Sequence, residues 1–204
     1  MTAAETPRLL LGLIGSGIQA SLTPAMHEQE GEAQGLRVLY QKIDLDRLGL
    51  GVEALGDLLV AAERMGFAGL NITFPCKQAV IPLLHDLSED AHQLGAVNTV
   101  VLCDGKRVGH NTDCSGFAEG FRRGLPGVKR DRVVQVGAGG AGSAVAQAAV
   151  KLGVGHLTVI DTDPAKAAQV AADVSARFGA GRASAGTDLA PACPEISPSR
   201  PASC

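Results

Sequence analysis

The sequence lacks the charge excess and the long apolar runs that mark several classes of protein. Its 18 basic and 21 acidic residues give a net charge of -3, so it lacks the basic excess that holds a nucleic-acid backbone. The apolar run at 9–14 is far too short to span a bilayer, and Glu5 with a lone Arg8 does not make the basic start of a signal peptide. We therefore expect a cytoplasmic protein that binds neither nucleic acid nor membranes.

Patterns for disulfides and metals are missing too. The five cysteines are odd in number and irregularly spaced, and no Cys-x-x-Cys or Cys/His pair offers a zinc site. We expect no metal and reduced thiols at Cys76, Cys103 and Cys114, with Cys76 packing in the interior rather than lining a pocket. The five histidines lack orienting partners in the sequence, and His110, close to Asp113, comes nearest to having one.

What is present is typical of a globular α/β protein with one large domain or two small ones, because 46% of the 204 residues are hydrophobic and 19% are charged. Apolar periodicity predicts strands at 9–14, 38–43, 69–73, 97–102 and 107–109, and helices at 24–34, 51–65, 77–84 and 89–94. Asp104-Gly105 is typical of a hairpin turn. The polar, turn-rich stretch after Leu125 predicts a domain boundary there.

The second predicted domain, 126–180, is a partial one. Its pattern predicts strands at 132–136 and 156–160 and helices at 140–152 and 164–178, which is one βαβα unit where a doubly wound nucleotide domain has two halves. Residues 181–204 are rich first in alanine and glycine and then in proline and serine. We expect this tail to be disordered and aberrant, as a frameshift or a disrupted gene would make it.

A glycine-rich turn, Gly137-Ala-Gly-Gly-Ala-Gly142, follows one of these strands and opens the next helix. Asp161 ends the following strand about twenty residues later, as a dinucleotide-binding fingerprint requires. The glycines allow a tight turn, a close approach of the backbone to a pyrophosphate, and close packing of helix on strand. The residues predicted to bind the dinucleotide are Gly137, Ala138, Gly139, Gly140, Ala141, Gly142 and Asp161.

Asp161 predicts NAD in preference to NADP. A carboxylate accepts hydrogen bonds from both ribose hydroxyls of NAD, but it repels the 2'-phosphate of NADP. The nearby Asp163 is better interpreted as the N-cap of the helix that begins at Pro164.

Three polar motifs lie upstream of the glycine-rich turn: Asn71-Ile-Thr-Phe-Pro-Cys-Lys77, Gly95-Ala-Val-Asn-Thr99 and Gly109-His-Asn-Thr-Asp113. In this order and spacing, and together with the turn, they resemble the shikimate/quinate dehydrogenase family over about residues 9–180. The resemblance implies an α/β substrate domain at 1–125, followed by a Rossmann-type domain. Because family members continue through the second half of that domain, we expect this chain to be C-terminally truncated.

The resemblance implies an oxidoreductase that oxidises a ring hydroxyl of shikimate or quinate to the 3-dehydro ketone, with Lys77 and Asp113 as the catalytic pair. From the residues alone, a lysine and an aspartate in such positions are more often surface charges. The family pattern places substrate contacts at Ser21, Thr23, Thr73, Lys77, Asn98 and Asp113. Asn71 is either a further contact or a turn former.

Thr23 stands where most shikimate-specific members have serine, and it resembles the NAD-using quinate/shikimate enzymes. Quinate metabolism therefore competes with aromatic amino acid biosynthesis in the shikimate pathway as the role of the protein. The alternative function is a non-catalytic, truncated protein that still binds a cyclohexane polyol acid. Homodimers are common in the family, and a homodimer is part of what the resemblance implies.

Overall fold

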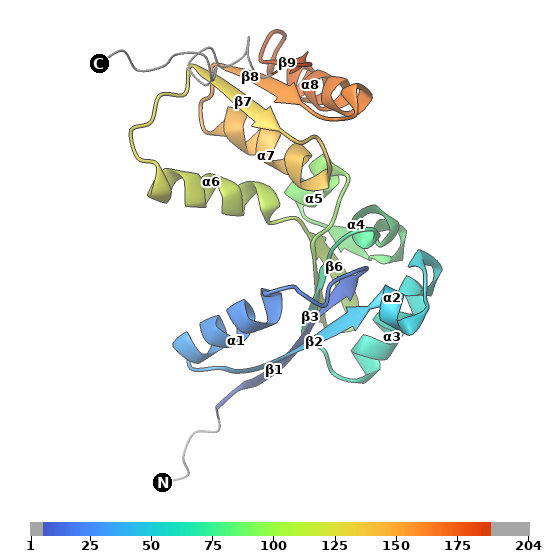
Figure 1. Cartoon of the computed structure of the whole chain (residues 1–204). Helices are drawn as coiled ribbons and strands as arrows, with labels where there is room; N and C mark the ends of the chain where they lie inside the picture. Colours follow the sequence, from blue (N-terminus) through green and yellow to red (C-terminus); the bar gives the residue numbers. More distant parts are fainter. Residues whose placement is uncertain (1–5, 189–204) are drawn as a thin grey trace, which may run out of the picture. The chain divides into compact units, whose positions relative to one another are not determined.

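A computed structural model describes residues 6–188, and the chain divides into two compact units between Thr112 and Asp113 (Figure 1). The strands of the first unit are β1 (Arg8–Gly15), β2 (Arg37–Asp44), β3 (Gly69–Ile72), β4 (Asp86–Leu87), β5 (Thr99–Cys103) and β6 (Lys106–His110). Its helices are α1 (Thr23–Ala33), α2 (Leu45–Leu48), α3 (Leu55–Arg64), α4 (Cys76–Ala79) and α5 (Glu89–Leu94), with 3-10 turns at Val52–Ala54 and Ile81–Leu83. The strands predicted from apolar runs are confirmed to within two residues at each end.

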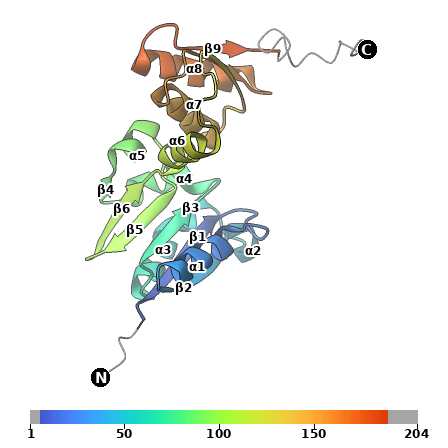
Figure 2. The ribbon, with the colours of Figure 1, turned by 90° about the vertical axis from the view of Figure 1, so that its left-hand side faces the viewer.

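The six strands form one mixed sheet in the order β2-β1-β3-β5-β6-β4. β1 pairs in parallel with both β2 and β3, which brings the carboxyl ends of these three strands to one edge of the sheet. β5 runs antiparallel to β3 and forms a hairpin with β6, seen beside α5 in Figure 2. Asp104 and Gly105 in the hairpin turn both have positive φ, 51° and 72°, so the predicted two-residue turn is confirmed.

The main core of this unit lies between the sheet and α3. Leu55, Leu59 and Ala62 are fully buried on one face of α3, which confirms the predicted helical stripe, although Met65 at its end is 62% exposed. α1 packs against β2 on the opposite face of the sheet (Figure 1). On that face Tyr40 packs with Leu13 and Ile18 in a second, smaller cluster.

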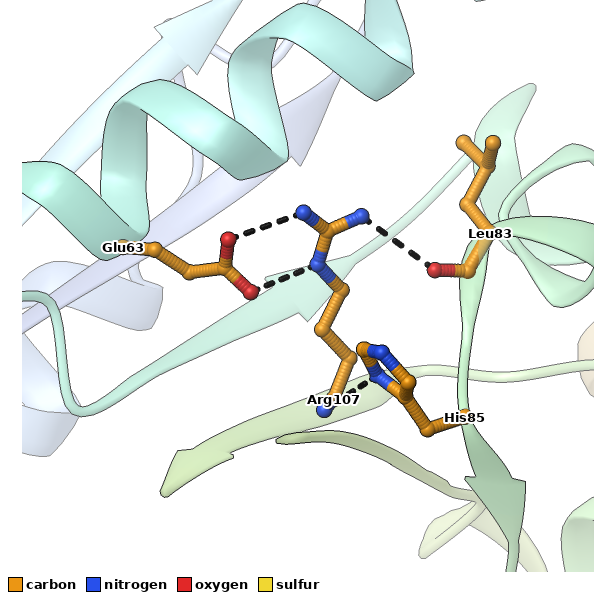
Figure 3. Close-up of polar contacts among 4 residues, drawn as sticks. All are labelled: Glu63, Leu83, His85 and Arg107. Atoms are coloured by element: carbon orange, nitrogen blue, oxygen red, sulfur yellow. Dashed lines mark hydrogen bonds and ion pairs between the residues drawn. The ribbon is translucent and has the colours of Figure 1, made fainter. Parts of the chain in front are cut away.

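An ion pair fastens α3 to β6 within the first unit (Figure 3). The guanidinium of Arg107 donates to both carboxylate oxygens of Glu63, from Nε at 2.6 Å and from Nη2 at 2.8 Å. Arg107 also donates to the carbonyl oxygen of Leu83, and its backbone N–H donates to His85 Nδ1. This arrangement ties α3, the turn before β4 and the β5–β6 hairpin to one side chain.

The second unit contains the helices α6 (Asp113–Gly124), α7 (Gly140–Lys151) and α8 (Pro164–Phe178) and the strands β7 (Arg132–Val136), β8 (His156–Ile160) and β9 (Ala183–Gly186). The strands form a parallel sheet in the order β7-β8-β9. Alanines and valines of α7 and α8 pack on β8 in a core of their own. The predicted ranges of β7, β8 and α8 are confirmed.

Two boundaries differ from the expectation. The sequence predicts a domain boundary after residue 125, whereas α6 groups with the second unit because it packs against α7. The sequence also predicts that order ends at residue 180, whereas 183–186 form β9, which α8 brings alongside β8. The assignment of 1–125 to substrate binding and of 126–180 to NAD binding stays a prediction, and residues 189–204 of the predicted tail lie outside the described residues.

Candidate functional site

Backbone hydrogen bonds bring the three polar motifs together in the first unit. The N–H of Ile72 donates to the carbonyl oxygen of Asn98 at 2.8 Å, and the N–H of Val97 donates to that of Lys77 at 2.8 Å. The N–H of Asn98 in turn donates to the carbonyl oxygen of His110 at 3.0 Å. Segments far apart in the sequence, 71–77, 95–99 and 109–112, therefore meet at one end of β3, β5 and β6.

The end of β1 completes this region. Ser16 N–H donates to the carbonyl oxygen of Phe74 and Thr73 N–H donates to that of Ile14, each at 2.9 Å. A Cβ at Gly15 would lie 2.3 Å from Thr73 Cγ2 and 2.9 Å from the Phe74 carbonyl oxygen, so only glycine lets the two segments approach so closely. Thr73 is thereby held next to the end of β1.

The predicted catalytic pair divides between the two units. Lys77 is half-buried in α4, directly after Cys76, which is fully buried in the core, as predicted for a packing residue. Burial raises the pKa of the Cys76 thiol, which keeps it protonated and unreactive. Asp113 begins α6 and belongs to the second unit, directly after Thr112. The pairing of Lys77 with Asp113 stays a prediction.

Ser21 and Thr23 lie together at the start of α1. The hydroxyl of Ser21 donates to Thr23 Oγ1 at 2.9 Å, and the N–H of Thr23 donates back to Ser21 Oγ at 3.3 Å. Both residues are half-buried. Ser21 also lines an open pocket of about 650 Å³ together with Tyr40 and Lys42, and the residues lining this pocket do not include Thr73, Lys77 or Asn98.

A row of hydrogen-bonded side chains, Tyr40, Asn71, Thr99 and Asn98, runs across the first sheet from β2 to the start of β5. We call it the polar row. Tyr40 OH donates to Asn71 Oδ1 at 2.5 Å, Asn71 Nδ2 donates to Thr99 Oγ1 at 3.2 Å, and Thr99 Oγ1 donates to Asn98 Oδ1 at 3.0 Å. The strand register explains the row, because Leu13, Asn71 and Thr99 are paired side by side across β1, β3 and β5. Sequence reasoning missed Tyr40 and Thr99, since only the register places them in line.

The glycine-rich turn of the second unit leaves its backbone accessible at the start of α7. Gly137 has φ 105°, which favours glycine, and a Cβ at Gly137, Gly139 or Gly140 would meet no heavy atom within 4 Å, so the backbone here is accessible to a ligand. Gly139 is the N-cap of α7 and makes no side-chain capping bond, so the first N–H groups of this helix are not capped by a side chain. At Gly142 a Cβ would lie 2.3 Å from the carbonyl oxygen of Gly137.

Asp161 connects this turn to the end of β8. Its Oδ2 accepts a hydrogen bond from the N–H of Ala138 at 2.6 Å, and its Oδ1 accepts from the N–H of Asp163 at 2.8 Å. These two backbone donors, first that of Asp163 and then that of Ala138, lower the pKa of the carboxyl below its ordinary value. Asp161 is therefore ionised at neutral pH, and each of its carboxylate oxygens has a further lone pair that can accept a hydrogen bond. Asp163 caps α8 by accepting from the N–H of Ala165, as predicted.

Comparison with known proteins adds to this geometry. Residues 13–100 match the family model of the shikimate dehydrogenase substrate binding domain, and residues 116–175 match that of the ThiF family. The chain is 59% identical over 176 residues to a shikimate dehydrogenase (NADP(+)) of Streptomyces avermitilis, covering 86% of this chain and 60% of the relative. The chain belongs to the shikimate/quinate dehydrogenase family.

Other relatives are named as enzymes that use NAD rather than NADP. The chain is 56% identical over 167 residues to a quinate/shikimate dehydrogenase (NAD(+)) of Corynebacterium glutamicum, covering 81% of this chain and 59% of that protein. The solved structure of quinate dehydrogenase from the same organism in complex with NAD has a TM-score of 0.81 and 50% identity, covering 89% of this chain and 64% of that one. The chain thus spans about 60% of the length of the curated relatives it matches.

None of the helices within residues 6–188 has the length and hydropathy that crossing a membrane requires. Within the same range, no group of three or more histidine, cysteine, aspartate or glutamate side chains is arranged to hold a metal ion.

Proposed function

We propose that the protein oxidises a ring hydroxyl of shikimate or quinate to the 3-dehydro ketone, with NAD as the electron acceptor. The observation that carries the proposal is the meeting of segments 71–77 and 95–99 at one end of the first sheet, on a chain whose second unit has a glycine-rich turn at the N-terminus of α7. Members of the family named as shikimate and quinate/shikimate dehydrogenases support it. Because the chain spans about 60% of their length, its activity is a proposal rather than a consequence of kinship.

In the proposed reaction the substrate alcohol loses a hydride from carbon and a proton from oxygen. When bound, the nicotinamide ring accepts the hydride. Lys77 takes the hydroxyl proton as the carbonyl double bond forms, and Asp113 orients the lysine and accepts a hydrogen bond from the substrate. Ser21, Thr23, Thr73 and Asn98 hold the carboxylate and the other hydroxyls, which fixes the ring for hydride transfer.

The cofactor proposal rests on Asp161. Its ionised carboxylate directly follows β8 beside the glycine turn, where it would accept hydrogen bonds from the ribose hydroxyls of NAD and would repel the 2'-phosphate of NADP. Relatives with either cofactor lie at similar identity, so kinship supports both. The remaining members of the proposed dinucleotide site are the glycine-turn residues, which offer backbone N–H groups and the N-terminus of α7.

The experiment is NADH formation by the purified chain with quinate or shikimate, run beside NADP and beside two variants. Lys77→Ala should lower turnover by about a hundredfold or more, since it removes the proton acceptor. Lys129→Ala changes an exposed lysine in the segment between α6 and β7 and should leave turnover unchanged. Turnover that survives in Lys77→Ala would contradict the catalytic assignment, and faster turnover with NADP would contradict the cofactor assignment.

The alternative is a protein that binds the polyol acid without oxidising it. The motifs of the first unit favour this alternative to the same degree, because Ser21, Thr23, Thr73 and Asn98 all lie in that unit. Shikimate binding measured by calorimetry, with no NADH formed, would select it. The homodimer implied by the resemblance stays a prediction, which light scattering tests through a mass of two chains.

A further inference from the structure

The polar row has a fixed direction. Tyr40 is buried, only 6% exposed, and this burial raises the pKa of its hydroxyl far above the ordinary value, so Tyr40 keeps its proton. In the structure this hydroxyl donates to Asn71 Oδ1, so Asn71 turns its carbonyl oxygen toward Tyr40. The NH2 end of Asn71 then faces Thr99, and an NH2 group only donates.

The direction continues through Thr99. Because its oxygen already accepts from Asn71, its single proton is given to Asn98 Oδ1. Asn98 Oδ1 also accepts from the backbone N–H of Thr112 at 3.1 Å, a donor that cannot rotate. The hydroxyl of Thr112 lies 3.3 Å from the same oxygen and 3.1 Å from Asn98 Nδ2, which donates to it. Contacts to Thr99 and Thr112 thus hold the Asn98 amide with its carbonyl oxygen toward Thr99.

We propose that Tyr40, Asn71 and Thr99 are positioning residues that fix the orientation of the Asn98 amide, one of the proposed substrate contacts. The proposal rests on the proposed function, in which Asn98 contacts the substrate.

The ring of His27 connects the row to the start of α1. His27 lies against Tyr40, with ring centroids 4.8 Å apart, and its Nδ1 hydrogen-bonds the carbonyl oxygen of Thr23 at 2.9 Å. Tyr40 therefore packs on the segment that carries Ser21 and Thr23 while its hydroxyl begins the row toward Asn98. One buried side chain supports two groups of proposed substrate contacts.

A pair of substitutions at Thr99 tests the proposal. Thr99→Val keeps the branched shape but removes the hydroxyl, whereas Thr99→Ser keeps the hydroxyl and removes a methyl group. We expect Thr99→Val to weaken shikimate binding by about tenfold in calorimetry, and Thr99→Ser to stay within about twofold of the parent protein. Tyr40→Phe, which removes one oxygen atom at the start of the row, should weaken binding by about threefold or more. Circular dichroism establishes that each variant is folded.

Two results of the binding measurements would overturn the proposal. Parent-like affinity in both Thr99→Val and Tyr40→Phe, or a loss in Thr99→Ser as large as in Thr99→Val, would overturn the proposal. If the parent protein binds neither shikimate nor quinate, the proposed function fails, and the side-chain amide signals of Asn98 in a nitrogen-15 NMR spectrum decide the row alone. Signals that move in Thr99→Val but not in Thr99→Ser would support it, and signals unmoved in both would overturn it.

Discussion

At Gly142 an added Cβ would lie 2.3 Å from the carbonyl oxygen and 2.9 Å from the carbonyl carbon of Gly137, both backbone atoms that cannot swing aside. Gln135 also connects the two ends of this turn, since its Nε2 donates to the carbonyl oxygens of Gly137 and Gly142 at 2.8 Å each. The close approach within the turn therefore depends on the absence of a side chain at Gly142 and on the buried amide of Gln135. The glycine was predictable from its motif, but Gln135 is a lone polar residue in a strand and gave no such signal.

We expect Gly142→Ala to lower the free energy of unfolding by about 2 kcal/mol, because the methyl group forces the backbone of the turn apart. Gly140→Ala is the matched control, since a Cβ there would meet nothing within 4 Å and the first turn of α7 tolerates alanine. Urea denaturation of the two variants measures the difference. Equal stability of the two variants would contradict the close approach of Gly142 to Gly137.

At the scale of the element, sequence patterns predicted the strands and helices whose periodicity is strong, such as Arg132–Val136 and Pro164–Phe178. They missed α6, whose three glycines, Gly116, Gly120 and Gly124, weaken the helical pattern, and which forms because it packs against α7. They missed β9 because its sequence, Ala-Ser-Ala-Gly, has no β-branched residue, and its pairing with β8 comes from the crossover through α8.

The same scale explains what could be predicted of the candidate site. Ser21, Thr73, Lys77 and Asn98 could be proposed from the sequence because each stands in a short motif that resembles one of the family. Tyr40 and Thr99 join the site only through pairing of β1 with β2 and β3, and of β3 with β5, which no local pattern encodes. Long-range register is the physical information that the sequence motifs do not carry.

Substitution of Glu63 on α3 tests how much its ion pair with Arg107 stabilises the first unit. The Arg107 guanidinium lowers the pKa of the Glu63 carboxyl, first by hydrogen bonding and then by its charge. Because the folded pKa lies below the unfolded value, the pair stabilises the fold above about pH 4.3, and this contribution is lost as the pH falls through the folded pKa. We expect Glu63→Gln to lower the free energy of unfolding at pH 7 by about 1 kcal/mol.

Denaturation at several pH values measures this effect. The loss in Glu63→Gln should shrink as the pH falls below about 4, because the parent protein then loses the same interaction. Glu119→Gln is the control, since Glu119 pairs with Arg122 and Arg123 on an exposed face of α6, and exposed pairs contribute little. A loss at Glu119 as large as that at Glu63, or one that does not depend on pH, would contradict the assignment.

At the scale of the whole molecule, the two units carry separate halves of the proposed chemistry. The first unit holds the polar row and most of the proposed substrate contacts, and the second holds the glycine turn and Asp161. Each has its own buried core. A ligand that binds only the native form of one unit should therefore protect that unit first.

We expect NAD to slow amide hydrogen exchange at 137–142 and in the first turn of α7, and shikimate to slow it at 71–77 and 95–99. Both effects follow because bound ligands reduce local opening of the backbone they contact. Exchange followed by mass spectrometry locates the protected peptides, with Asp161→Ala as a control that should reduce the NAD effect alone. Protection by NAD confined to the first unit would contradict the assignment of the glycine turn.

Tyr40 has one more property, which comes from the composition around it. The chain contains no tryptophan and no other tyrosine, so its tyrosine fluorescence comes from this one ring. That ring is buried in the first unit, in contact with His27 and hydrogen-bonded to Asn71. The emission of the unmodified protein is therefore an optical probe of the first unit by itself, and the polar row supplies its own fluorophore.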